Sequence, residues 1–182
     1  MNKLERAILE GARNAQKEYV SVTAGLRWLS HGPESFIEHP VAIRVAKDGF
    51  CVFPEASPKK ILKEQGIVPR GRPAGNLGQR FDLVVWFKEK NEVRAIIEIK
   101  RAWAITNLRG DKDKVAMCLE QGLTSAGYLL VYTEARGPNR LENLSKRLNQ
   151  WAVDLECTLV GEHVETQGDG TWNWCFGLFK VG

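Results

Sequence analysis

Two β-rich runs decide the fold of this chain: Arg80-Phe81-Asp82-Leu83-Val84-Val85-Trp86-Phe87 and Val93-Arg94-Ala95-Ile96-Ile97-Glu98-Ile99-Lys100. Because a short polar segment, residues 88–92, separates them, they predict an antiparallel β-hairpin. In an antiparallel hairpin that turns about Lys90, residues at equal distances from Lys90 along the chain face each other. Asp82 and Glu98 are each eight residues from Lys90, so they are expected to lie opposite each other. Side chains alternate along a strand, which adds Lys100 to the same face. The other face is then expected to be apolar and to consist of Phe81, Leu83, Val85, Phe87, Val93, Ala95, Ile97 and Ile99.

The segments outside the hairpin indicate an α/β fold. Apolar spacing and capping signals predict helices over residues 3–19, 33–47, 58–65, 110–121 and 139–151, with a short helix around 23–30. Strands are expected at residues 50–53 and 127–132, and a final hairpin over 156–181 with its turn at 168–170. Pro54 should end the first of these strands, and Pro40 should kink its helix or delay the helix start. This order predicts a mixed central sheet flanked by helices.

Length and composition fit one globular domain over residues 1–182. The chain is 43% hydrophobic and 26% charged, as expected for a protein with a sizeable core. No apolar run reaches the roughly 18 residues of a membrane helix, and the N-terminus lacks the pattern of a signal peptide, so we expect a cytoplasmic protein without a membrane partner. The four cysteines form no C-x-x-C pair, which indicates neither a zinc site nor a disulfide framework.

Basic residues are concentrated in one stretch of the chain. The net charge is +4, and residues 59–80 contain six basic side chains against the single acid Glu64: Lys59, Lys60, Lys63, Arg70, Arg72 and Arg80. A basic surface favours a polyanionic partner, and a solvated charged face is the plain alternative. Glycines and prolines between residues 66 and 78 rule out a regular element, so a basic, mobile loop is expected to lead into Asp82.

The three clustered side chains suit metal-assisted hydrolysis of phosphodiesters. Charged groups on a buried hairpin are unfavourable unless they are paired or bind a metal. Two carboxylates on adjacent strands can share a divalent cation, and Mg²⁺ prefers a few carboxylate oxygens with water and phosphate completing its shell. Lys100 could then hold or help to deprotonate a water molecule, or offset charge developing on phosphorus. A structural salt bridge from Lys100 to Asp82 or Glu98 is the alternative.

This pattern resembles that of the PD-(D/E)XK, or restriction-endonuclease-like, nucleases. The resemblance rests on Asp82 on one strand, Glu98-Ile99-Lys100 on the next, and the order helix, three strands, helix, strand across residues 33–133. Phe81 stands where the family motif has proline. The resemblance implies an αβββαβ core, with an extra N-terminal helix and a C-terminal helix plus hairpin outside it. It also implies catalysis by Asp82, Glu98 and Lys100, with Mg²⁺ or Mn²⁺ held by Asp82, Glu98 and the carbonyl oxygen of Ile99.

Further residues are candidates for the same site. Many such folds use an acid from the first core helix, where Glu34 and Glu38 lie one turn apart. We favour Glu38 as a catalytic residue because it lies deeper in the helix, while Glu34 stays open and solvation of both is the alternative. Arg70, Arg72 and Arg80 are expected to bind phosphates that flank the cleaved bond, unless the loop is a plain connection.

The sequence therefore predicts a magnesium-dependent deoxyribonuclease with DNA as its partner, and it leaves homodimerisation open. The alternative is a non-catalytic module that keeps the nuclease-like fold and binds nucleic acid or a protein. Retention of all three central residues favours the enzyme, because a binding module has no need of them.

Overall fold

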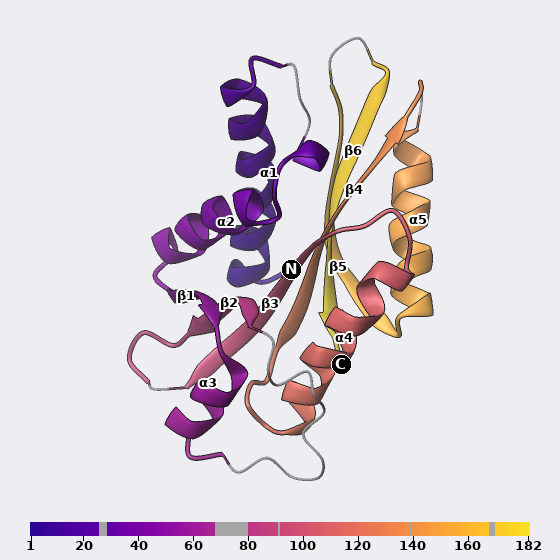
Figure 1. Ribbon diagram of the computed structural model, residues 1–182. Coiled ribbons are helices and arrows are strands. Elements are labelled where there is room, and N and C mark those ends of the chain that lie inside the picture. Colours follow the sequence, from indigo (N-terminus) through magenta and orange to yellow (C-terminus); the bar gives the residue numbers. More distant parts are fainter. Residues whose placement is uncertain (26–28, 68–79, 91, 139, 168–169) are drawn as a thin grey trace.

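The fold is a six-stranded mixed sheet with helices on both faces (Figure 1). The computed structural model describes residues 1–25, 29–67, 80–90, 92–138, 140–167 and 170–182. For residues 30 and 167 it describes only the backbone. Its strands are β1 (Cys51–Ala56), β2 (Phe81–Trp86), β3 (Val93–Arg101), β4 (Gly127–Arg136), β5 (Cys157–Gln167) and β6 (Trp172–Val181). Its helices are α1 (Lys3–Val22), α2 (Ser35–Lys47), α3 (Pro58–Glu64), α4 (Thr106–Glu120) and α5 (Leu141–Asp154), with a 3₁₀ turn, η1, at Leu29–His31. The predicted α/β architecture is confirmed.

The sheet order is β1-β2-β3-β4-β6-β5. Strands β3 and β4 run parallel, whereas every other neighbouring pair is antiparallel. Helix α4 makes the crossover between the two parallel strands, which a tight turn cannot provide. The C-terminal hairpin of β5 and β6 extends the sheet beyond β4. Among the described helices, none has both the length and the apolar character needed to cross a membrane.

The hairpin that the sequence predicts is present in the expected register. Leu83 pairs with Ile97, so one further step along the two strands brings Asp82 opposite Glu98. A β-bulge interrupts the register nearer the turn, between residues 85 and 86. The register at the acidic end therefore depends on regular strand pairing and not on the turn itself.

Both faces of the hairpin are buried, which corrects the expectation of a single apolar face. Helices α1 and α2 cover the face that carries Leu83, Val85, Ala95, Ile97 and Ile99. Helices α3, α4 and α5 cover the other face, which carries Val84, Trp86 and Ile96 (Figure 1). Phe81 and Val93 were assigned to the first set, but they pack with the second. The bulge explains Val93, because it pairs this residue with Trp86.

Two predicted element boundaries were wrong near the site. Helix α4 begins at Thr106, four residues before the predicted cap at Gly110. Strand β1 continues through Pro54, which pairs with Leu83. Proline is tolerated there because β1 is the edge strand of the sheet, where a missing N–H breaks no ladder bond.

Other predictions differ in detail or fall outside the described residues. Helix α2 begins at Ser35 and contains Pro40 within its length. Helix α1 extends to Val22, and the predicted short helix is represented by the turn η1, with residues 26–28 outside the described part of the chain. The predicted basic loop at residues 68–79, and most of the predicted turn of the final hairpin, also lie outside the described residues.

Helices α1 and α2 approach each other closely at Gly11. A Cβ atom on Gly11 would lie 2.6 Å from the Cα of Val41, which is closer than such atoms can pack. Only glycine allows this contact. Because α2 is held against α1 here, the contact also helps to fix the acidic N-terminal end of α2 over the sheet.

Candidate active site

Asp82 lies near the start of β2 and links this strand to β3. Its Oδ2 accepts a hydrogen bond of 2.6 Å from the backbone N–H of Ile99. Burial raises the pKa of Asp82, the Ile99 hydrogen bond and the charge of Lys114 oppose this, and the carboxylate of Asp111 adds to the rise. The predicted position of Asp82 beside the Glu98-Ile99-Lys100 segment is thus present in the structure.

Glu98 is deeply buried and pairs with a lysine that is equally buried. Lys114 of α4 places its Nζ 2.7 Å from Oε1 of Glu98, and each side chain is 4% exposed. The same ammonium donates a hydrogen bond of 2.9 Å to the carbonyl oxygen of Arg80 and lies 5.4 Å from the ring centroid of Phe81. Burial and then the charge of Asp82 raise the pKa of Glu98 to about 8, even though Lys114 lowers it.

Lys100 lies between acids from two flanking helices. Its Nζ is 3.4 Å from Oε2 of Glu34, the residue that immediately precedes α2, and 3.9 Å from Oδ2 of Asp111 on α4. The other oxygen of Glu34 accepts a hydrogen bond of 3.0 Å from the backbone N–H of Arg101. Burial acts to lower the pKa of Lys100, but the carboxylates of Glu34 and Asp111 act against it and the net shift is upward. Lys100 is therefore held as a cation at the end of β3.

Glu38 faces the same group of charges from one turn further along α2. Burial, followed by the charges of Asp82, Glu55 and Glu34, raises the pKa of Glu38 to about 7. Both candidate acids of the first core helix thus belong to the cluster. Glu34 contacts Lys100 directly, whereas Glu38 interacts electrostatically with the carboxylates of Asp82, Glu55 and Glu34.

The cluster carries more negative than positive charge. We call it the acidic cluster, and it consists of Glu34, Glu38, Asp82, Glu98 and Asp111 with the two lysines Lys100 and Lys114. The pKa values of four of its carboxyl groups, those of Glu38, Asp82, Glu98 and Asp111, are raised, in each case chiefly by burial and further by neighbouring carboxylates. Like charges held close together disfavour full ionisation. Binding of an additional cation would relieve this repulsion.

The donors in the acidic cluster fit Mg²⁺ better than a metal that needs a complete protein cage. Among the residues that the structure describes, no three His, Cys, Asp or Glu side chains already converge on one metal position. Mg²⁺ is usually held by one or two carboxylates, with phosphate and water in its other positions. The contacts described above use Oδ2 of Asp82 and Oε1 of Glu98, so each carboxylate keeps a second oxygen for a cation. These two oxygens and the carbonyl of Ile99 are a suitable donor set.

The predicted phosphate-binding arginines are only partly within the described structure. Arg80 is exposed and lies 3.3 Å from Glu55 of β1, in an ion pair in which both side chains are more than half exposed. Such a pair is weak in water and leaves the guanidinium accessible. Arg70 and Arg72 lie outside the described residues.

Asp111 and Lys114 of the acidic cluster were not predicted from the sequence. Both lie on α4, and Lys114 is buried with the apolar residues Leu108, Val115 and Cys118 of that helix. A signal was present, because helical spacing from Leu108 and Val115 places residues 111 and 114 on the same buried side. The predicted helix began at residue 110, so Leu108 lay outside it and this spacing was not seen.

Comparison with protein-family models, curated proteins and solved structures finds no match. The chemistry of the acidic cluster is therefore inferred from its own residues.

Proposed function

We propose that this protein is a metal-dependent nuclease of the restriction-endonuclease-like kind that hydrolyses phosphodiester bonds of DNA. The observation that carries this proposal is the meeting of Asp82, Glu98 and Lys100 in one acidic cluster with an excess of buried and half-buried carboxylates. The chain order α2-β1-β2-β3-α4-β4, with β3 and β4 parallel, supports the αβββαβ core that the sequence motif implies. The proposed metal is Mg²⁺ or Mn²⁺.

The residues of the acidic cluster would have different roles in hydrolysis. When bound, Mg²⁺ would polarise the phosphate and make water a better nucleophile. Lys100, held in place by Glu34 and Asp111, is suited to offset the negative charge that develops on the phosphate oxygens. Glu38 has a pKa of about 7, which suits a group that accepts the proton of the attacking water near neutral pH. The water oxygen bonds to phosphorus as the bond to the leaving oxygen breaks, and the leaving oxygen takes up a proton from solvent.

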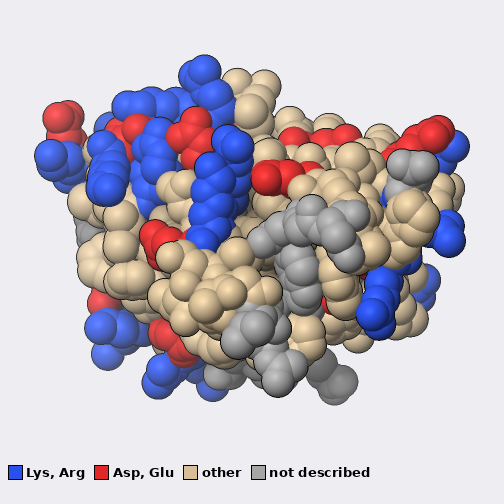
Figure 2. Space-filling view, turned by 90° about the horizontal axis from the view of Figure 1, so that it is seen from above, with Lys and Arg blue, Asp and Glu red and all other residues tan. Residues whose placement is uncertain are grey.

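The charge distribution on the surface supports a polyanionic substrate. Seen from above, Lys and Arg side chains gather mainly in the half of the molecule that holds α1 and α2, with fewer acidic side chains among them (Figure 2). Exposed basic residues of these helices include Arg6, Arg13, Lys17 and Lys47. A positive surface raises the local concentration of DNA and its association rate, in a manner that depends on salt.

Cleavage of DNA tests the proposal directly. Purified protein is incubated with supercoiled plasmid and with linear duplex, in Mg²⁺, in Mn²⁺ and in chelator. We expect cleavage only with metal, and a loss of about 100-fold or more in Asp82→Asn, which keeps the shape of the side chain but removes a charge for the metal. Asp154→Asn, at an exposed position at the end of α5, is the matched control and should cleave like the wild type. If the wild type shows neither cleavage nor a metal-dependent change in melting temperature, the non-catalytic binding module becomes the better interpretation.

A further inference from the structure

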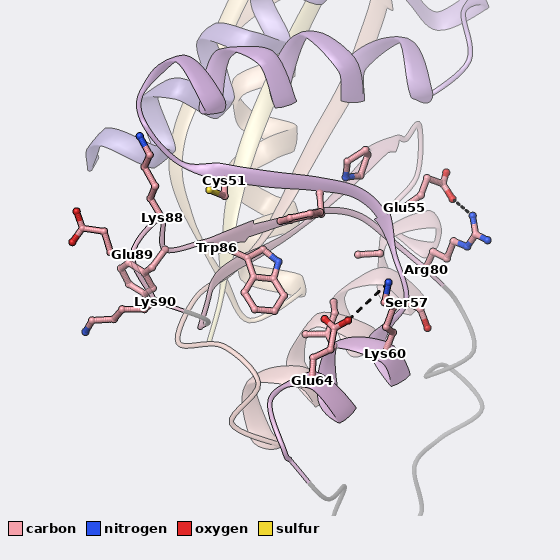
Figure 3. A pocket seen from close by; sticks show the side chains of 15 residues that line it. Cys51, Glu55, Ser57, Lys60, Glu64, Arg80, Trp86, Lys88, Glu89 and Lys90 are labelled. Atoms are coloured by element: carbon pink, nitrogen blue, oxygen red, sulfur yellow. Dashed lines mark hydrogen bonds and ion pairs between the residues drawn. The ribbon is translucent and has the colours of Figure 1, made fainter.

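A groove of about 860 Å³ runs beside the edge strand β1, between α3 and the turn that joins β2 to β3 (Figure 3). Its lining combines aromatic side chains, Phe53, Trp86 and Phe87, with cationic ones, Lys60, Lys88 and Lys90. We propose that this groove binds an unpaired nucleic-acid strand that continues from the acidic cluster. This inference rests on the proposed nuclease function and names the form in which the substrate is held.

Phe53 offers a ring face on which a base can stack, whereas Trp86 is only 8% exposed and packs behind it in the core. Phe53 is 55% exposed, although it is a large apolar side chain on a sheet edge. Its ring lies 6.1 Å from that of Trp86 in an edge-on arrangement, and Figure 3 shows the Trp86 indole in the middle of the groove. Stacking on aromatic side chains is tolerant of sequence, because every base has a π face. Within a duplex these faces are covered by neighbouring bases, so the feature favours an unpaired strand.

The charged residues of the groove favour a phosphate backbone. Lys60 lies on the α3 wall, whereas Lys88 and Lys90 lie at the opposite end, on the turn after β2 (Figure 3). The lining holds four basic side chains, with Arg80 as the fourth, against three acids. Lys60 pairs with Glu64 at 3.9 Å and Arg80 with the exposed Glu55 at 3.3 Å, so the excess of positive charge lies with Lys88 and Lys90. Glu89 is the remaining acid of the described lining. Lys59 and Lys63 are exposed on the same short helix and add positive charge beside the groove.

One end of the groove adjoins the acidic cluster. Glu55 lines the groove and is also close enough to Glu38 to raise its pKa. Arg80 lines the groove as well, and its carbonyl oxygen accepts the hydrogen bond from Lys114. From Arg80 to Phe87 the chain advances about 23 Å at ~3.3 Å per residue, which is long enough for several nucleotides of an unpaired strand. A strand cleaved at the cluster could therefore lie along the groove.

Binding measured in chelator tests the groove without relying on cleavage. The probes are a fluorescently labelled oligothymidylate and a duplex of the same length, followed by fluorescence anisotropy. The wild type should bind the single strand more tightly than the duplex. Phe53→Ala should weaken binding of the single strand by between about 5-fold and about 150-fold, the loss expected for one stacked base, and Phe53→Trp should retain it. Val153→Ala, on exposed α5, is the control and should bind like the wild type. Melting curves verify that each variant is folded.

The outcomes separate this inference from the proposed function. If the wild type does not bind the single strand, or prefers the duplex, or if Phe53→Ala binds like the wild type, the groove does not hold an unpaired strand, whether or not the protein cleaves DNA. If Phe53→Ala loses binding while neither the wild type nor Asp82→Asn cleaves DNA, the result supports binding of a single strand in the groove and contradicts the proposed nuclease activity.

Discussion

The buried pair of Glu98 and Lys114 gives the sharpest prediction about the site. In Lys114→Met, a side chain of similar length replaces the ammonium that lies 2.7 Å from the Glu98 carboxylate. Glu98 then loses the charge that lowers its pKa, so this pKa should rise above its present value of about 8. Near pH 7 a carboxyl with a pKa of about 8 already carries its proton, so the variant there loses the close contact between Lys114 and Glu98. This change should lower the free energy of unfolding by roughly 1–3 kcal/mol, as expected for a buried polar group without its partner.

The loss should grow in alkaline solution. Above pH 8 the wild type releases the Glu98 proton, whereas the folded variant retains it and the unfolded chain does not. The free energy of unfolding of the variant should therefore fall by ~1.4 kcal/mol per pH unit relative to the wild type, towards the roughly 3–5 kcal/mol expected when a buried charge loses its partner. For a chain of this size, each ~1 kcal/mol corresponds to about 2–4 °C in Tm.

Thermal melting in chelator at pH 7 and pH 9 measures both effects. The double variant Lys114→Met with Glu98→Gln removes both charges and should recover much of the stability, with little dependence on pH. Lys146→Met is the matched control, because its ion pair with Glu142 is exposed and weak, and its Tm should hardly change. A single variant that melts like the wild type at pH 9, or a double variant no more stable than the single one, would refute the buried ion pair as a determinant of the site.

Three other predictions follow from the same structure. In Lys100→Ala, DNA cleavage should fall by about 100-fold or more while binding persists, because the ammonium acts mainly in the transition state; loss of binding in equal measure would contradict this. In chelator, the free energy of unfolding should decline as pH rises from the ordinary carboxyl pKa of 4.5 up to about 7 and about 8, the raised pKa values of Glu38 and Glu98, and should level off above them. Within this range the folded protein holds protons that the unfolded chain has released. Mg²⁺ should accordingly raise the Tm more at pH 8.5 than at pH 6, and an equal increase would count against metal binding by these carboxylates. Gly11→Ala should reduce stability by about 1–3 kcal/mol, because its Cβ would lie 2.6 Å from the backbone of Val41, whereas Gly110→Ala, which has open space around it in α4, should not reduce the Tm.

The acidic cluster also explains why a lysine is buried among apolar residues. A buried ion pair seldom adds stability compared with a well-packed apolar pair. Lys114 instead offsets part of the charge of Glu98 and, through the carbonyl of Arg80, ties α4 to the start of β2. Its role in the fold is thus to hold the carboxylate and the strand that carries Asp82 in one arrangement.

The sequence by itself determined those features that depend on residues close together in the chain. The register of the hairpin, and with it the opposition of Asp82 and Glu98, follows from two β-rich runs and an alternation of two residues. The β-bulge between residues 85 and 86, nearer the turn, was not predicted. The types of most elements, and the α/β class, follow in the same way from periodicity. Periodicity did not predict where α2 and α4 begin, nor that β1 continues through Pro54. Edge position and packing against the sheet outweigh single-residue preferences at these points.

Only the tertiary structure decided which charges surround this pair. Glu34 is 66 residues from Lys100 in the chain, yet their side chains meet because the close packing of α1 on α2 sets the N-terminal end of α2 beside the end of β3. Asp111 and Lys114 join them because the parallel pairing of β3 with β4 requires a crossover, which lays α4 over the face that carries Glu98. Helical spacing can place Asp111 and Lys114 on the buried side of α4, but the sequence does not show which charges they meet, since the distance along the chain between the partners is set by the path of the whole fold.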